Sequence, residues 1–469
     1  MADEGVLLHG AERMLRGSVL YADFFEILPP GGFILTAAWF GIAGISIWSA
    51  RTLAILTIVG IACFTYAACR EASKNSPLSA FLVVGWVVMS QGPWTQVNHH
   101  YFTTLFSMVA AWAALNNLGD KQSGLRWPLI AGTAAGAAAM FTPNCGVLAV
   151  LAAATAFMSS QRYRTELIAY GLGVVLVPTG LLAYVIWHHA FAAALYQVIL
   201  YPAVHYAPAN TAPFGTFASA QNFPLFYVFP LAGSFLVYGW RICLHDRLLR
   251  TCAALAIAGF IGCFPRPDIV HIAFAAPLAC PLLACCMNRI AQRWYVPYRY
   301  AAAVVLIGLF TPAALAFSST VQKALAGEIV PAPRGDLILL RQNGASQLLA
   351  RLAALPPQDG YFFYQFIPML PFLSAREHVS RYDVFIPGYT LPSQYQEACM
   401  SLLSDATWVI MQRADSKLYK QAQDAQPHET REFERALETT FDLVAREGEF
   451  ELRRRREGVS GTVCTNITG

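Results

Sequence analysis

The chain opens with MADEGVLLHGAERMLRGSVLYADFFEILPPGG, residues 1–32, and this segment carries its most informative polar residues. Asp3, Glu4, Asp23 and Glu26 lie just ahead of the first long apolar run. Carboxylates at the border of a membrane domain mark either a functional site or an ordinary polar flank. The segment alone leaves both interpretations open.

The composition is that of a membrane protein. Of 469 residues, 56% are hydrophobic and only 13% are charged, whereas soluble domains carry roughly a quarter charged residues. We therefore expect a mainly α, polytopic helical membrane protein. The net charge of +4 is too small to indicate nucleic-acid binding, and no basic stripe with interleaved aromatic residues accompanies it.

Long apolar runs follow the N-terminal segment. A helix needs about 20 apolar residues to cross a bilayer, and on that criterion we expect about ten spans. They are predicted at 32–50, 52–69, 78–92, 100–117, 128–158, 166–188, 223–240, 251–264, 269–287 and 300–319. Thr142-Pro143-Asn144 interrupts the segment 128–158, which is either one broken crossing or a hairpin of short helices.

Three domains are predicted: an external loop at 1–31, a transmembrane helical domain at 32–320 and an α/β domain at 335–469. In the first, Val6, Leu7, Ala11 and Met14 recur at helical spacing and predict an amphipathic helix along the membrane surface.

Clusters of arginine predict the orientation. They are Arg162/Arg164, Arg241/Arg247/Arg250 and Arg289/Arg293/Arg299, and the positive-inside rule makes these loops cytoplasmic. The loops 189–222 and 265–268, and everything after about 320, then lie outside. Residues 1–30 also lie outside if the segment 128–158 crosses the membrane once. If it is a hairpin, residues 1–30 are cytoplasmic, unless another predicted span near 51–92 is also wrong. We prefer the first option because it places all the informative loops on one face.

Charge rises and apolar runs shorten from about residue 335. Short strands are predicted at 361–364, 407–411 and 450–452, and helices at 346–355, 392–403 and 429–445. Cys399 and Cys464 lie in this part and could pair, although spacing alone cannot establish a disulfide. Most other cysteines lie in apolar runs, as small buried hydrophobes do.

Two N-terminal groups suit sugar transfer. Asp3-Glu4 could supply the general base that deprotonates an acceptor hydroxyl. In Tyr21-Ala22-Asp23-Phe24-Phe25-Glu26, acids alternate with aromatic rings, and rings beside carboxylates suit the apolar faces and hydroxyls of a sugar. A solvated chain start and an interfacial aromatic anchor are the plainer alternatives.

The loop Phe264-Pro265-Arg266-Pro267-Asp268-Ile269-Val270-His271 separates two spans. The two prolines stiffen the backbone around Arg266, and a guanidinium there suits a phosphate. Asp268 could orient Arg266, with His271 one turn further on. The alternative is a simple Arg266–Asp268 pair in a loop.

His99 and His100 begin another apolar run. Neighbouring histidines on a helix face different ways, which argues against a metal site and favours a hydrogen-bonding role in a pocket. No Walker loop, GxSxG elbow or HExxH motif is present. A cytosolic nucleotide-driven enzyme is therefore not indicated.

These motifs resemble the first large external loop of the polyprenyl-phosphate-dependent membrane glycosyltransferases of the GT-C class. That class includes protein O-mannosyltransferases, lipid A aminoarabinose transferases and galacturonosyltransferase-like proteins. Asp3-Glu4 match its acidic pair, and Gly17, Tyr21, Asp23 and Phe24 match its G-x-x-x-Y-x-D-F segment. Arg266, Asp268 and His271 look like its later external-loop motif.

The resemblance implies an enzyme that moves a sugar from a polyprenyl-phosphate donor to an envelope glycan, lipid or protein acceptor. It would act at the external face of the inner membrane, with the C-terminal domain extracytoplasmic. Asp3 would be the base, supported by Glu4, and Asp23 and Glu26 would bind hydroxyls. Arg266 would stabilise the leaving lipid phosphate. No cofactor is certain, and a divalent cation stays open.

Two alternatives remain: a transporter of lipid-linked saccharides, and a protein like an O-antigen ligase or polymerase. A transporter would bury charges within its spans, whereas the acids and Arg266 lie at span ends, which favours an enzyme. Members of the class begin with a transmembrane helix before the acidic pair, and the sequence given starts at that pair. We therefore expect an in-frame apolar stretch of about 20 residues upstream of Met1.

Overall fold

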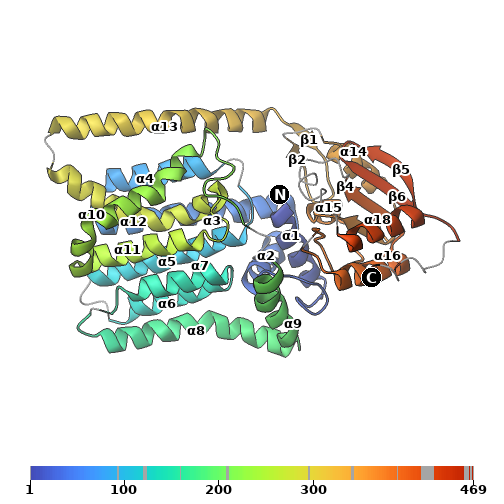
Figure 1. Cartoon of the computed structure of the whole chain (residues 1–469), viewed down its shortest axis with the longest axis horizontal. Helices are drawn as coiled ribbons and strands as arrows, with labels where there is room; N and C mark the ends of the chain where they lie inside the picture. Colours follow the sequence, from blue (N-terminus) through green and yellow to red (C-terminus); the bar gives the residue numbers. More distant parts are fainter. Residues whose placement is uncertain are drawn as a thin grey trace.

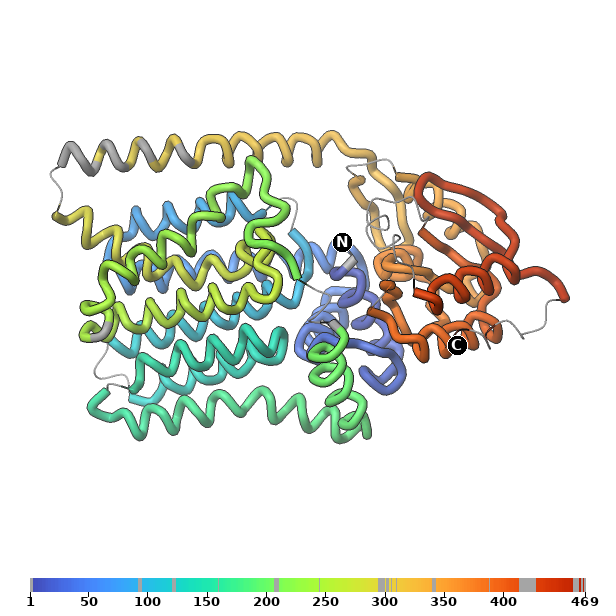
Figure 2. The backbone as a smooth tube through the Cα atoms, in the orientation of Figure 1, coloured from blue at the N-terminus to red at the C-terminus, as the bar shows by residue number. Residues whose placement is uncertain are grey.

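A computed structural model shows a bundle of long helices and a small α/β domain, with the N-terminal segment between them (Figure 1, Figure 2). The structure describes residues 2–91, 95–119, 124–158, 160–206, 211–293, 296–339, 343–387, 389–412, 427–458, 464 and 467.

The bundle consists of consecutive helices that run back and forth (Figure 1). They are α3 (Ile47–Ser73), α4 (Ser76–Ser90), α5 (His99–Gly119), α6 (Arg126–Ala139), α7 (Pro143–Ala154), α8 (Tyr163–Trp187), α10 (Val228–His245), α11 (Arg247–Gly262), α12 (Ile269–Arg293) and α13 (Val296–Leu325). Among the described residues, four helices are long and apolar enough to cross a membrane, and other apolar helices are shorter. The expected number of about ten spans stays a prediction.

Two predicted spans have other boundaries in the structure, and the preferred single crossing at 128–158 was wrong. The segment 128–158 is a hairpin of α6 and α7, because Pro143 starts a new helix after Thr142. The segment 32–50 is not one helix either: α2 (Pro30–Ala43) ends at Gly44, whose φ is 83°, before α3 begins. The N-terminal segment nevertheless lies at the same end of the bundle as the loop 265–268, because Asp3 and Glu26 line one cavity together with Arg266 and Asp268.

Glycines allow α6 and α8 to approach closely. A Cβ atom at Gly132 would lie 2.0 Å from the carbonyl oxygen of Tyr170, and one at Gly136 would lie 2.1 Å from that of Val174. Small residues four apart on one face are typical of helix pairs within membranes. This glycine pair therefore fixes the distance between the two backbones.

An irregular segment leaves the bundle after α8. It comprises α9 (Phe191–Leu195), two π-helical turns, η1 (Tyr196–Leu200) and η2 (Pro202–Tyr206), and the 3₁₀ turn η3 (Phe223–Tyr227). π-Helical turns are rare in proteins and are frequent at functional sites.

The C-terminal domain has a four-stranded sheet in the order β3-β4-β6-β5, with β3 and β4 parallel and the other pairs antiparallel. Its elements, with a preceding two-stranded ribbon, are β1 (Glu328–Val330), β2 (Leu337–Leu339), α14 (Ala345–Ala354), β3 (Tyr361–Tyr364), α15 (Met369–Ser374), α16 (Pro392–Asp405), β4 (Trp408–Gln412), α18 (His428–Thr440), β5 (Phe441–Glu447) and β6 (Phe450–Arg455). The helix predicted at 429–445 was too long, because Phe441 already begins β5. Cys399 and Cys464 form a disulfide.

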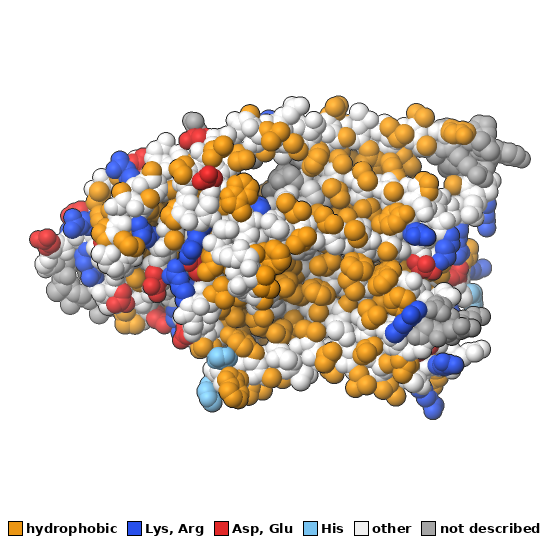
Figure 3. Space-filling model, turned by 180° about the vertical axis from the view of Figure 1, so that it is seen from behind, with side chains coloured by type: hydrophobic (Ala, Val, Ile, Leu, Met, Phe, Trp, Pro, Cys, Tyr) orange, Lys and Arg blue, Asp and Glu red, His pale blue; other side chains and the backbone are white. Residues whose placement is uncertain are grey.

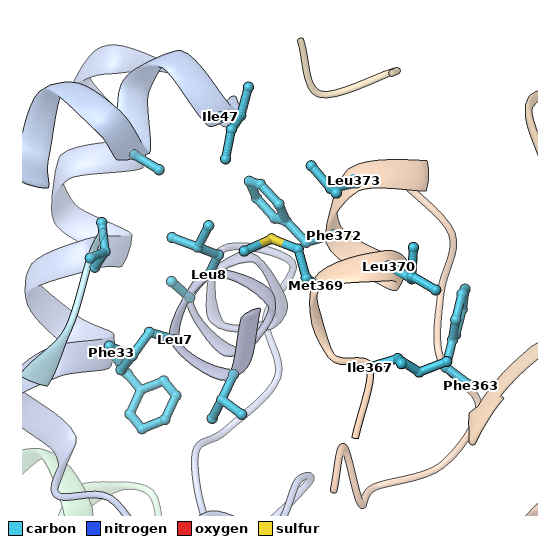
Figure 4. Close-up of a cluster of buried hydrophobic side chains, with 14 of the residues drawn as sticks. Leu7, Leu8, Phe33, Ile47, Phe363, Ile367, Met369, Leu370, Phe372 and Leu373 are labelled. Carbon is cyan, nitrogen blue, oxygen red and sulfur yellow. The ribbon is translucent and has the colours of Figure 1, made fainter. Parts of the chain in front are cut away.

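Helix α1 (Ala2–Leu15) is buried between the two domains. The prediction that it lies along the membrane surface was therefore wrong. Leu7 and Leu8 are fully buried, with Phe33 of α2 on one side and Met369 and Phe372 of α15 on the other (Figure 4). Its apolar stripe binds protein on two sides, so α1 joins the bundle to the C-terminal domain.

One face of the molecule shows a broad apolar surface over the bundle, with basic side chains at the end away from the C-terminal domain (Figure 3). The exposed apolar residues of the bundle include Leu172 and Leu176 on α8 and Val304 and Ile307 on α13. Soluble monomers rarely expose broad contiguous apolar surfaces, and this one suits contact with lipid chains.

Candidate functional site: a cavity between three parts of the chain

A cavity of about 660 Å³ lies where the end of the bundle, the N-terminal segment and the C-terminal domain meet. Seven of the predicted site residues line it: Asp3, Glu26, His99, His100, Arg266, Asp268 and His271. The other three, Glu4, Tyr21 and Asp23, do not line it. Residues separated by more than two hundred positions in sequence are thus brought to one cavity.

Asp268 organises one end of the cavity. Its carboxylate accepts a hydrogen bond of 2.7 Å from Nε of Arg266 and bonds of 3.0 Å from the backbone N–H groups of Val270 and His271. The His271 ring nitrogen Nδ1 lies 2.8 Å from the same carboxylate. Asp268 therefore caps α12 and orients two side chains at once.

Burial and charge act in opposite directions on Asp268. Burial alone would raise its pKa, but the hydrogen bonds from His271 and the positive charge of Arg266 bring the pKa below the usual value. The Asp268 side chain is buried, while that of Arg266 is 36% exposed. Asp268 is thus a fixed anion that holds Arg266 at the cavity wall.

The loop between η2 and η3 supports this cluster. The N–H of Gly215 donates to the carbonyl of Pro267 over 2.8 Å, and the N–H of Ile269 donates to the carbonyl of Thr216 over 3.0 Å. The guanidinium of Arg266 also lies over the ring of Phe217. Backbone bonds on both sides of Asp268 therefore fix the position of the cluster.

The histidines of α5 lie beside it. The ring of His100 is 4.2 Å from that of His99 and 5.0 Å from that of His271, measured between centroids. Nδ1 of His99 is buried and has no hydrogen-bond partner among the described residues. Within that part of the chain, no group of three or more His, Cys, Asp or Glu side chains is placed to hold a metal ion.

Glu26 lines the same cavity, and its side chain is almost completely buried. The carboxylate oxygen Oε1 has no hydrogen-bond partner within the described chain. Burial raises the pKa of Glu26 well above its usual value, and the negative charge of Asp383 adds to the rise. The backbone N–H of Glu26 donates to Oε1 of Gln197 over 2.8 Å, which fixes the residue to η1.

The three predicted residues outside the cavity have structural contacts. Glu4 is buried, pairs with Arg51 and accepts a bond of 2.9 Å from the N–H of Val97. The hydroxyl of Tyr21, a buried residue with φ of 71°, donates to the carbonyl of Leu28 over 2.8 Å. Asp23 is exposed and accepts a bond of 2.6 Å from the N–H of Val19.

Two solved structures share this architecture. ArnT from Cupriavidus metallidurans bound to undecaprenyl phosphate aligns over 97% of this chain and 94% of its own, with a TM-score of 0.54 and 13% sequence identity. Its apo state aligns over 96% and 93%, with a TM-score of 0.55 and 13% identity. The chain has the ArnT fold. The expected architecture, a polytopic helical bundle with a small C-terminal α/β domain, is therefore confirmed. No protein-family model and no curated protein sequence matches the chain.

Within its ArnT fold, the C-terminal domain supplies a cavity wall that the sequence did not predict. Asp383 lines the cavity, is buried, and lies 3.1 Å from Nδ1 of His9 and 3.4 Å from a guanidinium nitrogen of Arg13. Tyr382, Tyr389 and Gln394 line it as well. His9 and Arg13 on the polar face of α1 were the sequence signal for this contact, because the other face of the helix is apolar. Their partner Asp383 could not be identified from the sequence, since it lies 374 residues from His9.

Proposed function

We propose that this protein is a membrane glycosyltransferase that moves a sugar from a polyprenyl-phosphate donor to an acceptor hydroxyl. One observation carries the proposal. A single cavity at the end of an ArnT-like bundle combines an oriented arginine with carboxylates from a separate segment. The ArnT structure contains undecaprenyl phosphate, a ligand of the class proposed here for the donor's lipid phosphate.

The Arg266 cluster suits the phosphate end of the donor. Its guanidinium faces a cavity and is held by Asp268 and Phe217, so little reorganisation is needed when negative charge develops on the leaving phosphate. A phosphate monoester ionises for the second time near pH 6 and leaves without an added proton. Sugar transfer therefore needs a cation beside the leaving phosphate and a base beside the acceptor hydroxyl.

Two observations support placing the cavity on the extracytoplasmic side of the inner membrane. The three arginine clusters named above lie at the opposite end of the bundle, as the positive-inside rule requires of the cytoplasmic end. The C-terminal domain holds the Cys399–Cys464 disulfide, and disulfides persist in oxidising compartments. We propose an envelope glycan, lipid or protein as the acceptor.

The test is transfer of radiolabelled sugar from a polyprenyl-phosphate donor by membranes that contain the protein. We expect wild-type membranes to transfer the label and Arg266→Ala to lose about 10²–10³-fold in rate, the usual effect of removing one anion-stabilising donor. Arg241→Ala, which changes an exposed arginine at the other end of the bundle, is the matched control. Full transfer by Arg266→Ala would exclude this phosphate site.

A further inference from the structure

Within the described part of the chain, four carboxylates line the cavity, namely Asp3, Glu26, Asp268 and Asp383. A sugar transfer needs only one proton acceptor. We propose that Glu26 is that acceptor and takes the proton of the acceptor hydroxyl, although the sequence resemblance gives this role to Asp3. The inference rests on the proposed glycosyl transfer and assigns a residue within it.

Two of the four carboxylates are already engaged. Asp268 holds Arg266 and His271, and Asp383 holds His9 and Arg13. Cationic partners stabilise the ionised form, and both residues have pKa values below the usual range. A carboxylate stabilised in this way is a poor base, and protonating it would break the contacts that hold its partners.

Asp3 and Glu26 are the two carboxylates that remain. Asp3 lines the cavity from the first turn of α1. Glu26 is almost fully buried, and Oε1 has no partner among the described residues. An oxygen that no protein group satisfies is available to accept the hydrogen bond of a substrate hydroxyl, and leaving it unused has a cost in stability.

The surroundings of Glu26 fix its geometry without neutralising it. Gln197 accepts from the backbone of Glu26 and donates through Nε2 to the carbonyl of Tyr21 over 2.9 Å, which holds both ends of the loop to η1. The neighbouring Phe25 packs between Tyr201 and Tyr382, with ring centroids 5.0 Å and 5.5 Å away. The loop is therefore anchored to the π-helical segment and to the C-terminal domain.

The step balances within the cavity. The acceptor O–H bond breaks and its proton goes to the Glu26 carboxylate, while the acceptor oxygen forms a bond to the anomeric carbon. The bond from that carbon to the phosphate oxygen breaks, and its electron pair leaves with the polyprenyl phosphate beside Arg266. The protonated Glu26 then returns its proton to solvent.

Azide separates the role of a base from other roles, because the anion attacks the anomeric carbon without a proton to remove. Purified wild-type protein, Glu26→Gln and Asp3→Asn are given a polyprenyl-phosphate sugar with either the natural acceptor fraction or sodium azide. Glu377→Gln, an exposed carboxylate in the C-terminal domain, is the matched control. Release of polyprenyl phosphate is measured as a function of pH.

We expect Glu26→Gln to lose about 10²–10⁴-fold in transfer to the acceptor, the usual contribution of general-base catalysis, and to keep release by azide within about threefold of wild type. We expect a smaller loss in Asp3→Asn, with the acidic limb of the pH profile still present. In Glu26→Gln that limb disappears.

Three results overturn the assignment. Transfer by Glu26→Gln close to the wild-type rate shows that another group accepts the proton. Loss of the azide reaction together with acceptor transfer shows that Glu26 acts on donor cleavage or on folding. If the pH limb disappears only in Asp3→Asn, Asp3 is the base. A wild-type protein that releases no phosphate in either reaction is a different failure, because it removes the proposed glycosyl transfer itself.

Discussion

At the scale of single residues, Glu26 shows how function and stability oppose each other. A buried carboxylate without a partner lowers the stability of a fold, and such groups cluster where chemistry needs them. Asp383 is equally buried but is compensated by His9 and Arg13. The two carboxylates therefore respond to substitution in opposite ways.

Replacing Glu26 by glutamine tests directly how much the buried carboxylate lowers the free energy of unfolding. The pKa of Glu26 is raised in the folded state, so ionisation destabilises the fold once pH exceeds the usual carboxyl value of about 4.3. We expect Glu26→Gln to stabilise the protein at pH 8 by about 0.5–2 kcal/mol, as is common when a functional group is removed. The gain shrinks as pH falls and vanishes below about 4.3.

Thermal unfolding in detergent at pH 8 and pH 4 measures this effect, with Glu377→Gln as the control. A lower unfolding temperature for Glu26→Gln at both pH values would mean that the carboxylate is a structural group.

Asp383 gives the reverse prediction. Its pKa lies below the usual value, because Arg13 and His9 outweigh the effect of burial. Its stabilising contribution is therefore present above about pH 3.9 and is lost as pH falls toward the lowered pKa. We expect Asp383→Asn to destabilise the protein at pH 7 by about 3–5 kcal/mol, because it leaves Arg13 without its buried anion. Denaturant unfolding of Asp383→Asn beside Asp405→Asn, an exposed aspartate, measures the difference, and equal stability would contradict the docking role of this cluster.

At the scale of elements, the contacts between helices depend on positions where a side chain cannot fit. A Cβ atom at Gly173 of α8 would lie 2.6 Å from the carbonyl oxygen of Leu129, whereas one at Gly171 meets nothing within 4 Å. We expect Gly173→Ala to cost about 1–3 kcal/mol through overpacking. Gly171→Ala, two residues away on the same helix, should be neutral or slightly stabilising. Melting temperatures in the same detergent compare the two variants, and similar values would show that α6 and α8 are not in close contact.

Local patterns predicted the elements better than their ends. The strands at 361–364 and 450–452 were found because aromatic and apolar residues cluster there, and both form in the structure. The helix at 429–445 was extended too far because Phe441 continues an apolar stripe that suits a helix and a strand alike. The break at Gly44 was missed because the apolar run continues across it.

At the scale of the whole molecule, the cavity forms where three distant segments meet. Arg266, Asp268 and His271 were predicted together because they are neighbours in sequence. The contribution of Asp383 was invisible, because it depends on α1 docking against the C-terminal domain. Composition could not predict this docking, since an apolar stripe on a short helix suits lipid and protein equally well.

The proposed glycosyl transfer separates the sugar of the donor from its polyprenyl phosphate, and this separation can be measured directly. Purified protein in lipid nanodiscs is given a donor labelled separately in its sugar and in its phosphate, together with an envelope extract as acceptor. We expect one polyprenyl phosphate to be released for each sugar attached to an acceptor, and we expect Arg266→Ala to leave both labels on the donor. If wild-type protein leaves the two labels joined, or moves them together across the bilayer of a proteoliposome, the protein is a carrier of lipid-linked sugar and the account is contradicted.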